Sequence, residues 1–569
     1  MGERKGVRSG VFHGEKIRGG VWGRFFVEEG GFGLDFAQGR EVVWGKNRAR
    51  CAVNTENEMK IAGRIKQGFY FDSVTLMRVG RELSGLPGIE EASVVMATDA
   101  NKSILDMSGL LLPEFKKCGD QDLAIAVKAK DAASAEAAFE KAEEMLSRKK
   151  APAGGAAAAA PAPRDVAGAS EQLGGANLAI ISVAGKYAAR EARKALANGL
   201  NVMLFSDNVS MEDELELKKE AHKKGLIVMG PDCGTSIING VPLAFANAVP
   251  KGPIGVVGAS GTGTQEVTCV IANAGCGVSQ AIGTGGRDVK DAIGGITFLD
   301  AMKALADDPE TKVILLVGKP PQEGVMKKIY AQIKKTKKPV VTLLLGEGGT
   351  PRTLEQAALQ AVALAKGEDP AAVIKALDAR DAELKAKADK VVARKKAPQG
   401  RYLRGLFSGG TFCAEAQVVL DGILRHVYSN APLGESKKLK NSWKPEKNAI
   451  IDLGEDEFTR GRAHPMIDFT LRNKMMQEVA DDPETAVLLL DLVLGYGSNL
   501  DPLGEWEALV KKIAKKIPVV IGVTGTAGDP QPKAAIVEAL RKAGAFVEET
   551  NAAACRLAGY LAAGIAKSK

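Results

Sequence analysis

Several protein classes are excluded by what this sequence lacks. Its 569 residues include only seven cysteines, and no two of them form a CxxC pair. This pattern excludes a disulfide framework and a cysteine-rich zinc site, and it favours reduced thiols in a cytoplasmic protein without a bound metal. No apolar run reaches the ~18 residues that a membrane span needs. The net charge of +8 is small for this length and does not indicate a nucleic-acid partner.

Aromatic residues are also scarce, at 5%, and histidine occurs only four times, whereas glycine reaches 65 residues. A chain rich in small residues suits an α/β fold, in which such residues line the turns between strands and helices. The apolar share of 45% and the charged share of 26% are those of an ordinary globular protein. At roughly 100–200 residues per domain, the length allows about three to five domains.

The first 58 residues differ from the rest of the sequence. They hold Trp22, Trp44 and five of the 17 phenylalanines, and no helical or strand period persists in them. They have neither the apolar segment of a signal peptide nor the acid-poor composition of a transit peptide. We interpret residues 1–58 as an extension that is either non-native, with Met59 as the natural start, or flexible.

The rest of the sequence alternates strand-like and helix-like segments, which predicts a multidomain α/β protein. We expect one Rossmann-like domain and two flavodoxin-like domains, preceded by a small α+β domain. The charged helix at 381–396 is expected to be a solvated spacer. The predicted divisions are a small α+β domain at 59–148, an Ala/Pro/Gly linker at 149–170, the Rossmann-like domain at 171–250, a first flavodoxin-like domain at 251–366, a charged helical linker at 367–400 and a second flavodoxin-like domain at 401–569.

An internal repeat relates the last two domains. The sequence DDPET occurs at 307–311 and again at 481–485, and each copy precedes a buried apolar strand. A second apolar strand follows in both copies, at 337–346 and 515–525. SGTGTQE and SGGTFCAE lie upstream of the two copies. Three landmarks in the same order predict a duplicated structural unit.

A glycine-rich loop opens a helix in each copy of the repeat. Unpaired backbone N–H groups and roughly half a positive charge at a helix N-terminus attract phosphate or carboxylate. We expect the two loops to face each other and enclose a phosphoryl-like or carbonyl-like group; the alternative is that both are plain turns of a doubly wound fold. The candidate phosphate- or acyl-binding residues are Ser260, Gly261, Thr262, Gly263, Ser408, Gly409, Gly410 and Thr411.

These motifs resemble a known family. GVVGASGTGTQE (255–266) and DDPETKVILLVG (307–318) resemble the α subunit of succinyl-CoA synthetase, and residues 401–569 resemble the C-terminal domain of its β subunit. With the preceding domain, the order resembles the FdrA family. That resemblance implies a CoA-binding domain at 171–250, CoA-ligase domains after it, an acyl-CoA synthetase-like activity with CoA as cofactor, and a role in purine (allantoin) catabolism as a subunit of an oxamate carbamoyltransferase.

The sequence departs from the family at the reacting groups. The resemblance implies a phosphorylated histidine where this chain reads GEGGTP (346–351), and a glutamate where Lys319 stands. No histidine lies between residues 223 and 425. The family's ATP-grasp domain has no counterpart in this sequence, so ATP bound by such a domain is not expected. These departures argue against ordinary ATP-dependent succinyl-CoA synthesis by this chain alone.

Three residues are candidates for catalysis. His464 lies near Arg462 and Asp468, a combination able to bind and protonate an anionic acyl or carbamoyl group, unless the histidine only caps a loop. Arg287 ends a strand, where it suits a bidentate clamp on carboxylate or phosphate, or else a surface ion pair. Lys319 also ends a strand, and we expect it to supply charge in place of the missing histidine.

Candidate cofactor-binding residues lie in the Rossmann-like domain. The family analogy places Ser182, Asp207 and Asn208 near the adenosine or pantetheine of CoA. Cys233 is either a low-pKa thiol at a helix start or a small buried residue. Cys413 is expected to be a packing residue. No metal ligands are predicted.

Two functions stay open from the sequence. The chain is either a catalytic subunit for acyl or carbamoyl transfer between phosphate, an amine acceptor and CoA, or a CoA- and phosphate-binding scaffold that has lost catalysis. A conventional ADP-forming succinate–CoA ligase-like enzyme is a further alternative. We expect a cytoplasmic hetero-oligomer with other subunits of the same pathway, acting on a small molecule, with no nucleic-acid or membrane partner.

Overall fold

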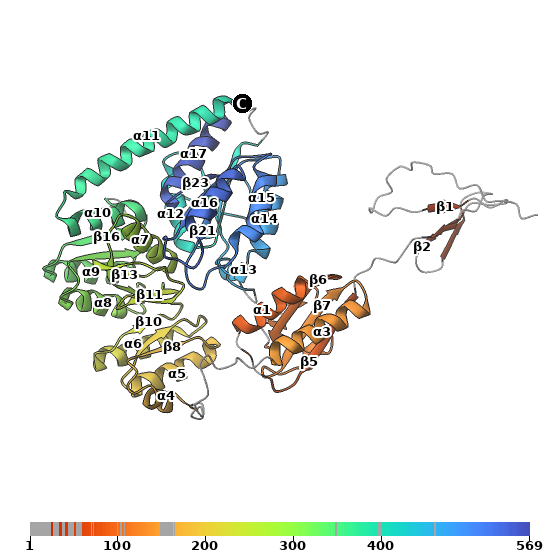
Figure 1. Cartoon of the computed structure of the whole chain (residues 1–569), viewed down its shortest axis with the longest axis horizontal. Helices are drawn as coiled ribbons and strands as arrows, with labels where there is room; N and C mark the ends of the chain where they lie inside the picture. The colour runs from red at the N-terminus through yellow and green to blue at the C-terminus, as the bar shows by residue number, and fades with distance from the viewer. Residues whose placement is uncertain are drawn as a thin grey trace, which may run out of the picture. The chain divides into compact units, whose positions relative to one another are not determined.

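The computed structural model describes residues 60–568, with gaps at 70, 72, 99–100, 103–104, 107, 148–162, 164, 347–349, 395–399 and 460–461, and the backbone of four short strands before them (Figure 1). These strands are β1 (Arg24–Phe26), β2 (Gly33–Phe36), β3 (Arg40–Val43) and β4 (Arg50–Ala52). Most of the predicted extension and of the predicted linker therefore lies outside the described residues. The chain divides into two units, Met1–Gly155 and Ala156–Lys569, which are taken in turn.

The first unit contains the small α+β domain that the sequence predicts. Its antiparallel sheet has the order β5-β7-β6, and the residues of β7 alternate between two apolar clusters, one on each face. Helices α1 and α3 cover one face, and Phe115 in the short helix η1 covers the other. The elements are β5 (Lys60–Lys66), α1 (Ser73–Ser84), β6 (Ile89–Met96), η1 (Phe115–Lys117), β7 (Leu123–Ala129) and α3 (Ala132–Ser147).

The second unit begins with the predicted Rossmann-like pattern. Three parallel strands lie in the order β10-β9-β8, and helices α5 and α6 connect them. This arrangement confirms the βαβαβ pattern. The elements are α4 (Val166–Gln172), β8 (Leu178–Ile181), α5 (Gly185–Ala197), β9 (Asn201–Leu204), α6 (Met211–Lys224) and β10 (Val228–Met229).

A six-stranded sheet follows, in the order β12-β11-β14-β13-β15-β16. Its first two strands precede residue 250, so the predicted boundary there divides strands that pair in one sheet: Ile237 of β11 pairs with Ala281 of β14. Helices α7 and α10 pack on one face and α8 and α9 on the other. The elements are β11 (Thr235–Ile238), β12 (Val241–Ala244), β13 (Lys251–Gly258), α7 (Gly261–Asn273), β14 (Val278–Gly283), α8 (Ile296–Asp307), β15 (Val313–Gly318), α9 (Glu323–Lys335), β16 (Val340–Leu344) and α10 (Leu354–Lys366).

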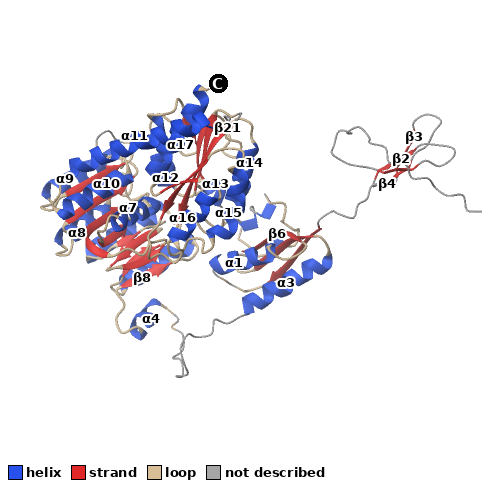
Figure 2. Cartoon of the chain, turned by 45° about the horizontal axis from the view of Figure 1, so that its top comes forward, coloured by secondary structure: helices blue, strands red, loops and turns tan. Residues whose placement is uncertain are grey.

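The last sheet has seven strands in the order β19-β18-β20-β17-β21-β22-β23. Helices flank both of its faces, as they do in the preceding sheet (Figure 2). The elements are β17 (Tyr402–Phe407), α12 (Gly410–Asp421), β18 (Val427–Ser429), β19 (Lys437–Lys438), β20 (Asn448–Asp452), α13 (Asp456–Thr459), α14 (Thr470–Asp481), β21 (Thr485–Val493), α15 (Pro502–Ile513), β22 (Val519–Thr524), α16 (Lys533–Lys542), β23 (Phe546–Glu548) and α17 (Asn551–Lys567).

The repeat predicted from the sequence is present in these two sheets. In each, the strand before the glycine-rich loop is central and pairs in parallel with the strand that follows the DDPET segment, β13 with β15 and β17 with β21. The other neighbour of β13 is β14, the next strand of the chain, whereas that of β17 is β20, with β18 beyond it. The DDPET segments adopt the same turn, because Asp308 accepts a hydrogen bond from Thr311 Oγ1 at 2.7 Å and Asp482 accepts one from Thr485 Oγ1 at 3.4 Å. The two repeats therefore match in the central strand pair and in the turn before its second strand, and they differ on the other side of the sheet.

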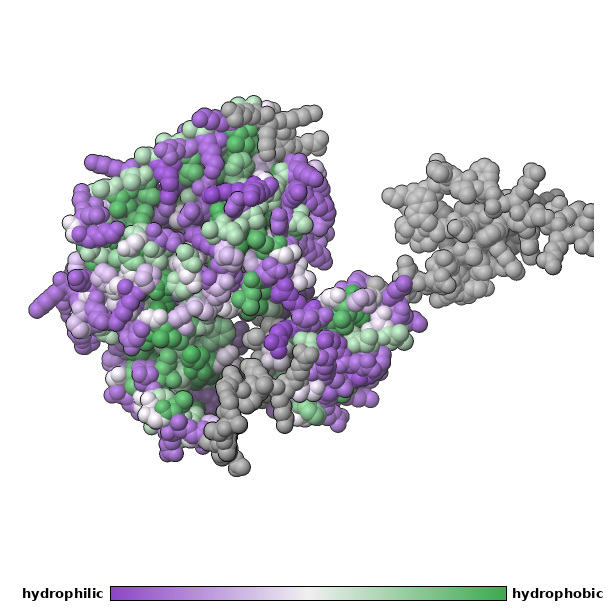
Figure 3. All heavy atoms as spheres, viewed as in Figure 1, coloured by the Kyte–Doolittle hydropathy of each residue, from purple (hydrophilic) through white to green (hydrophobic). Residues whose placement is uncertain are grey.

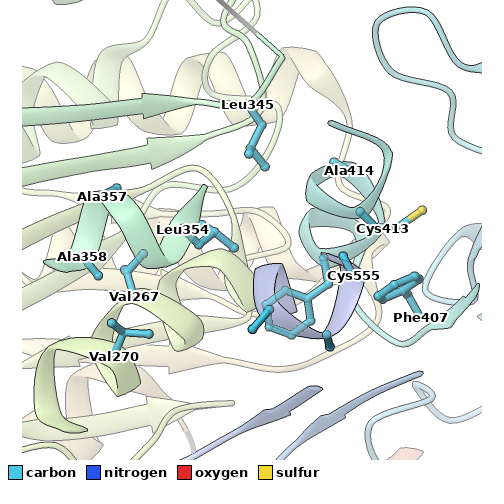
Figure 4. Close-up of a cluster of buried hydrophobic side chains, with 14 of the residues drawn as sticks. Val267, Val270, Leu345, Leu354, Ala357, Ala358, Phe407, Cys413, Ala414 and Cys555 are labelled. Carbon is cyan, nitrogen blue, oxygen red and sulfur yellow. The ribbon is translucent and has the colours of Figure 1, made fainter. Parts of the chain in front are cut away.

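One hydrophobic core joins the two repeats. Helices α7 and α10 of the first repeat and α12 and α17 of the second pack into it. Figure 4 shows Val267 and Leu354 from the first repeat in one cluster with Cys413 and Cys555 from the second. Each fully buried aliphatic side chain contributes about 1.5–3 kcal/mol. This packing brings the N-termini of α7 and α12 together.

The charged helix α11 (Pro370–Arg394) connects the two repeats. Leu384 and Ala388 on it are buried in the shared core, and Asp381 accepts a hydrogen bond from Tyr560 of α17 at 2.7 Å. The expectation of a solvated spacer is wrong for this face, because the helix covers the apolar side of α17. Hydrophilic residues are abundant on the visible surface, with smaller hydrophobic patches among them (Figure 3). Within the described ranges, no helix combines the length and the apolar character needed to cross a membrane.

Candidate functional site

The two glycine-rich loops lie face to face. Ser260 and Thr411 share a hydrogen bond between their hydroxyl groups, across the boundary of the two repeats. A Cβ atom built on Gly409 would lie only 2.5 Å from Cγ2 of Thr262, so glycine is required there for the loops to approach. At Gly261 the nearest atom to such a Cβ, Thr235 Oγ1, is 3.5 Å away, which is ordinary contact. Gly263 is also crowded, because a Cβ atom there would lie 3.0 Å from Cγ2 of Thr411. The loops thus meet through a serine, two threonines and two tightly packed glycines.

Each loop sits at the N-terminus of a helix. Ser260 caps α7 by accepting a hydrogen bond from the backbone N–H of Gly263 at 3.0 Å, and Gly409 is the residue before α12. Both helices start at the carboxyl ends of central parallel strands, where ligands bind in open α/β sheets. Two helix N-termini in contact concentrate partial positive charge at one point, which favours an anion.

The hydroxyl of Ser408 is engaged elsewhere. Its Oγ and its backbone N–H donate to Asp491, at 2.7 and 2.9 Å. Asp491 is buried and forms an ion pair with the buried Arg472, which also donates to the carbonyl of Leu406 at 2.8 Å. Ser408 therefore orients the loop instead of offering its side chain to a ligand, contrary to the direct role expected from the sequence.

Three ionisable groups gather at the start of α12. A Cβ atom on Gly410 would lie 2.6 Å from Asp452 Oδ2 and 3.5 Å from Lys319 Nζ. A Cβ atom on Gly454 would lie 3.1 Å from Asp452 Oδ1 and 3.3 Å from His464 Nε2. Lys319 follows β15 of the first repeat, whereas Asp452 ends β20 of the second. The fold thus brings together Lys319 and His464, both predicted, and Asp452, which the sequence interpretation missed.

Burial sets the protonation of these groups. It lowers the pKa of His464 to about 4, with Asp491 opposing the shift, so the imidazole is neutral near pH 7. Nδ1 of His464 accepts a hydrogen bond from the backbone N–H of Met466 at 3.3 Å, which leaves Nε2 to carry the proton. Burial raises the pKa of Asp452 to about 6, against the attraction of Lys319. His464 can therefore donate a hydrogen bond but carries no charge.

The expected partners of His464 point elsewhere. Arg462 lies over the ring of Trp443, 5.8 Å from its centroid, and Asp468 accepts the backbone N–H of Thr470 at 2.8 Å. The imidazole instead lies 5.7 Å from the ring of Phe245, in the segment after β12. The Arg–His–carboxylate group expected from sequence proximity is therefore not formed by these three side chains.

Arg287 lies in a separate polar network. Its guanidinium donates to the carbonyl of Val209 at 2.8 Å and pairs with Glu214 at 2.9 Å. Lys218 binds the same glutamate and Asp288, at 2.9 and 2.7 Å. Arg287 therefore connects the Rossmann-like domain to the next sheet. Its hydrogen bond to Val209 and its ion pair with Glu214 involve no residue of the two facing loops.

The candidate cofactor residues fall into two groups. Ser182, Asp207 and Asn208 are exposed at the carboxyl ends of β8 and β9, where a Cβ atom on Gly185 would lie 2.2 Å from the carbonyl of Asp207. Cys233 is fully enclosed, and burial raises the pKa of its thiol to about 11. A low-pKa thiol is excluded there, and Cys233 is a buried residue. Cys413 is likewise buried in the shared core, as expected of a packing residue.

Two buried glutamates, also missed from the sequence, link the repeats. Glu266 of α7 accepts the backbone N–H of Asn551 at 2.8 Å, and Glu415 of α12 accepts that of Leu354 at 2.6 Å. Each glutamate side chain thereby completes the N-terminus of a helix in the other repeat. Their signal was present in the sequence, because each glutamate ends one of the two matched loop motifs, SGTGTQE and SGGTFCAE.

Three family models match separate parts of the chain. They are an AllF-type heavy metal-associated domain at 59–163, a CoA binding domain at 250–346 and a CoA-ligase at 406–561. The CoA-binding match falls on the segment that the sequence interpretation assigned to a ligase domain, whereas the CoA-ligase match falls on the second flavodoxin-like domain.

The residues of the first matched domain do not fit a heavy metal. Residues 59–163 contain no histidine and one cysteine, Cys118. That thiol is buried, burial raises its pKa, and it donates to the carbonyl of Glu114 at 3.7 Å. Soft metals bind thiolate, imidazole or thioether ligands, and a site built from cysteine and histidine cannot form with this one enclosed thiol. Across the described part of the chain, no group of three or more His, Cys, Asp or Glu residues is placed to hold a metal.

The chain is also similar to individual proteins. It is 44% identical over 469 residues to the uncharacterized protein YahF of Escherichia coli K12, which covers 80% of this chain and 88% of YahF. The α subunit 1 of an ADP-forming succinate–CoA ligase of Archaeoglobus fulgidus is 32% identical over 181 residues, 31% of this chain and 60% of that subunit. A dinucleotide-forming acetyl-coenzyme A synthetase 1 of Ca. Korarchaeum cryptofilum aligns at 17% identity and a TM-score of 0.26, over 69% of this chain and 84% of that one. In this chain an AllF-type N-terminal domain precedes a CoA-binding and a CoA-ligase match, and the chain belongs to the family of YahF.

Proposed function

We propose that this acyl-CoA synthetase-like protein transfers an acyl or carbamoyl group, with the phosphate of the donor bound between the N-termini of α7 and α12. The contact of the two loops through Ser260, Thr262, Gly409 and Thr411 is the observation that carries the proposal. More specifically, we propose that the chain is an FdrA-type subunit of an oxamate carbamoyltransferase-like complex of purine (allantoin) catabolism. Other subunits of that cytoplasmic complex complete the reaction.

The geometry supports anion chemistry at this point. A phosphate between the loops would replace the one hydrogen bond that Ser260 and Thr411 now share, and would meet the N–H groups of both first turns. Lys319, in the loop after β15, brings its ammonium group to the start of α12, where Nζ would lie 3.5 Å from a Cβ atom on Gly410. Donors that are already aimed at a developing anion stabilise the transition state without reorganisation, and one such donor is worth about 10²–10³-fold in rate.

The departures from the ligase family favour carbamoyl or acyl transfer from an acyl or carbamoyl phosphate, the mixed anhydride of phosphate with a carboxylic or carbamic acid. The loop that carries a phosphohistidine in the resembled family reads GEGGTP here, and its residues 347–349 lie outside the described ones. Lys319 replaces a glutamate that would support that histidine. Such a transfer needs neither a phosphohistidine nor an ATP-grasp domain. The CoA-binding and CoA-ligase matches support CoA as a ligand of the chain.

The test is a product assay on the full chain co-purified with its partner subunits. One mixture holds carbamoyl phosphate and oxamate, and another holds CoA, ATP and succinate. Gly409→Ala should lower turnover in the first mixture by about 10²–10³-fold, because its methyl group pushes the loops apart. Gly422→Ala, at the other end of α12, is the matched control, since its Cβ would meet nothing closer than 4.0 Å.

Two outcomes would favour the alternatives. Succinyl-CoA formed only in the second mixture, by the chain alone, would indicate a conventional ADP-forming ligase-like enzyme. Full turnover of the complex with Gly409→Ala would indicate a non-catalytic CoA- and phosphate-binding scaffold. The tight approach of the loops favours the catalytic proposal. A scaffold does not need two helix N-termini so close that the hydroxyl groups of Ser260 and Thr411 share a hydrogen bond.

A further inference from the structure

We infer that Asp452 is the proton acceptor of the transfer site, a role that rests on the proposed function. Its carboxyl group lies at the end of β20, only 3% exposed, under the first turn of α12. Oδ1 accepts the backbone N–H of Gly454 at 2.9 Å. Oδ2 points to Gly410, as the 2.6 Å separation from a Cβ built there shows, and no hydrogen bond to it is formed by the described residues.

The backbone of Asp452 is held independently of its side chain. Asn430 donates to the carbonyl of Asp452 at 2.8 Å and accepts its backbone N–H at 2.9 Å. The turn at Gly454 needs only an acceptor at Oδ1. An asparagine at position 452 would keep both interactions, so a purely structural residue would tolerate that change. The ionisable Oδ2 is the part of this side chain that the local fold does not use.

Four charged or titratable groups surround this carboxyl. Lys319, from the loop after β15, attracts its negative charge, whereas Glu455 and Asp491 repel it. Asp491 is neutralised by its ion pair with Arg472. His464 is uncharged near neutral pH, because burial lowers its pKa to about 4. With burial included, the pKa of Asp452 is about 6, so the carboxylate form that accepts a proton is available at pH 7.

The proposed step moves the acyl or carbamoyl group from phosphate to the acceptor. A nitrogen or sulfur nucleophile of the acceptor attacks the carbonyl carbon of an acyl or carbamoyl phosphate, and a C–N or C–S bond forms. The C–O bond to phosphate breaks, and its electron pair leaves with the phosphate, which stays between the helix N-termini and Lys319. The proton of the nucleophile passes to Asp452 Oδ2 and then to solvent or the departing phosphate. No oxidant, reductant or metal is needed.

Asp452→Asn separates this role from anion binding. The variant removes a negative charge next to the bound anion, so the affinity for sulfate should stay equal or increase, while turnover of carbamoyl phosphate should fall by about 100-fold or more. Sulfate is a suitable probe because it does not titrate between pH 5 and 8. In the wild-type chain its affinity should fall as the pH rises through about 6 and Asp452 ionises. In Asp452→Asn that dependence should disappear.

Isothermal titration calorimetry with sulfate on the full chain and turnover of the co-purified complex provide the two readouts. Asp421→Asn, an exposed carboxylate at the end of α12, is the matched control and should change neither. Full turnover of Asp452→Asn with intact sulfate binding would overturn the inference alone. Loss of sulfate binding in Asp452→Asn would also overturn it, since it would assign the residue a structural role. Absence of sulfate binding in the wild-type chain would overturn the proposed function as well.

Discussion

At the scale of single residues, burial decides which groups are reactive. The thiols of Cys233 and Cys413 are enclosed, and burial raises the pKa of each above its ordinary value, to about 11 for Cys233. The same loss of hydration lowers the pKa of His464 to about 4 and raises that of Asp452 to about 6. Burial therefore keeps the thiols of Cys233 and Cys413 protonated, keeps the imidazole of His464 neutral, and brings the pKa of Asp452 closer to neutral pH.

Thiol labelling tests this at residue resolution. In the folded chain at pH 8, Cys233 and Cys413 should resist iodoacetamide, because the thiolate is the nucleophile and neither side chain is accessible. Cys276 is partly exposed and should be labelled under the same conditions. Peptide mass spectrometry before and after unfolding in urea measures each site. Rapid modification of Cys233 in the folded protein would contradict the assignment.

At the scale of elements, the two repeats exchange helix caps. Glu266 of α7 accepts the backbone N–H of Asn551 at 2.8 Å and the hydroxyl of Thr524 at 2.5 Å. Glu415 of α12 accepts the backbone N–H of Leu354 at 2.6 Å. Since α17 starts at Asn551 and α10 at Leu354, each repeat satisfies backbone donors of the other. These bonds fix the relative position of α7 and α12, and with it the spacing of the two loops.

These caps predict a pH dependence of stability. Burial raises the pKa of Glu266 to about 7 and that of Glu415 to about 8, above their ordinary 4.5. The folded chain therefore retains protons that the unfolded chain releases, and the free energy of unfolding should fall as pH rises from about 5 to about 8. Glu415→Gln should show a smaller slope, because its side chain no longer titrates. Urea unfolding at several pH values measures the slope.

The control for this experiment is Glu507→Gln, a change at an exposed glutamate of α15, which should leave the slope of the wild-type chain unaltered. An identical slope for Glu415→Gln and the wild-type chain would show that Glu415 does not carry its proton in the folded state. The free energy of unfolding is expected to fall as pH rises. A carboxylate in a surface ion pair would have the opposite effect, because its stabilisation of the folded state grows as pH rises.

At the scale of the second unit as a whole, a buried ion-pair network joins the Rossmann-like domain to the first repeat. Lys218 of α6 lies 2.9 Å from Glu214 and 2.7 Å from Asp288, and all three side chains are fully buried. Lys218 also donates to the carbonyl of Thr284 at 3.1 Å. Asp288 accepts the backbone N–H of Phe298 at 2.8 Å and so anchors the start of α8. The network connects α6, the turn after β14 and α8.

Breaking this network should destabilise the unit strongly. Lys218→Met leaves two buried carboxylates without their shared cation, which costs about 3–5 kcal/mol in free energy of unfolding. Lys219→Met, at the neighbouring exposed lysine, should cost less than about 0.5 kcal/mol. Urea unfolding of the full chain compares the two variants. Equal stability of both would indicate that water reaches the site and solvates the carboxylates.

The order of strands and helices, the repeat and the two helix-opening loops are determined by the sequence itself, because hydrophobic periodicity and glycine turns act over a few residues. The tertiary structure alone decides which polar groups meet. Glu266 and Asn551 lie 285 residues apart, and only the packing of the two repeats into one core makes them partners. For the same reason Lys319 lies near Asp452, Arg287 forms an ion pair with Glu214, and one face of α11 is buried. Local patterns carry no information on such distant contacts, since these depend on how the two sheets share one core.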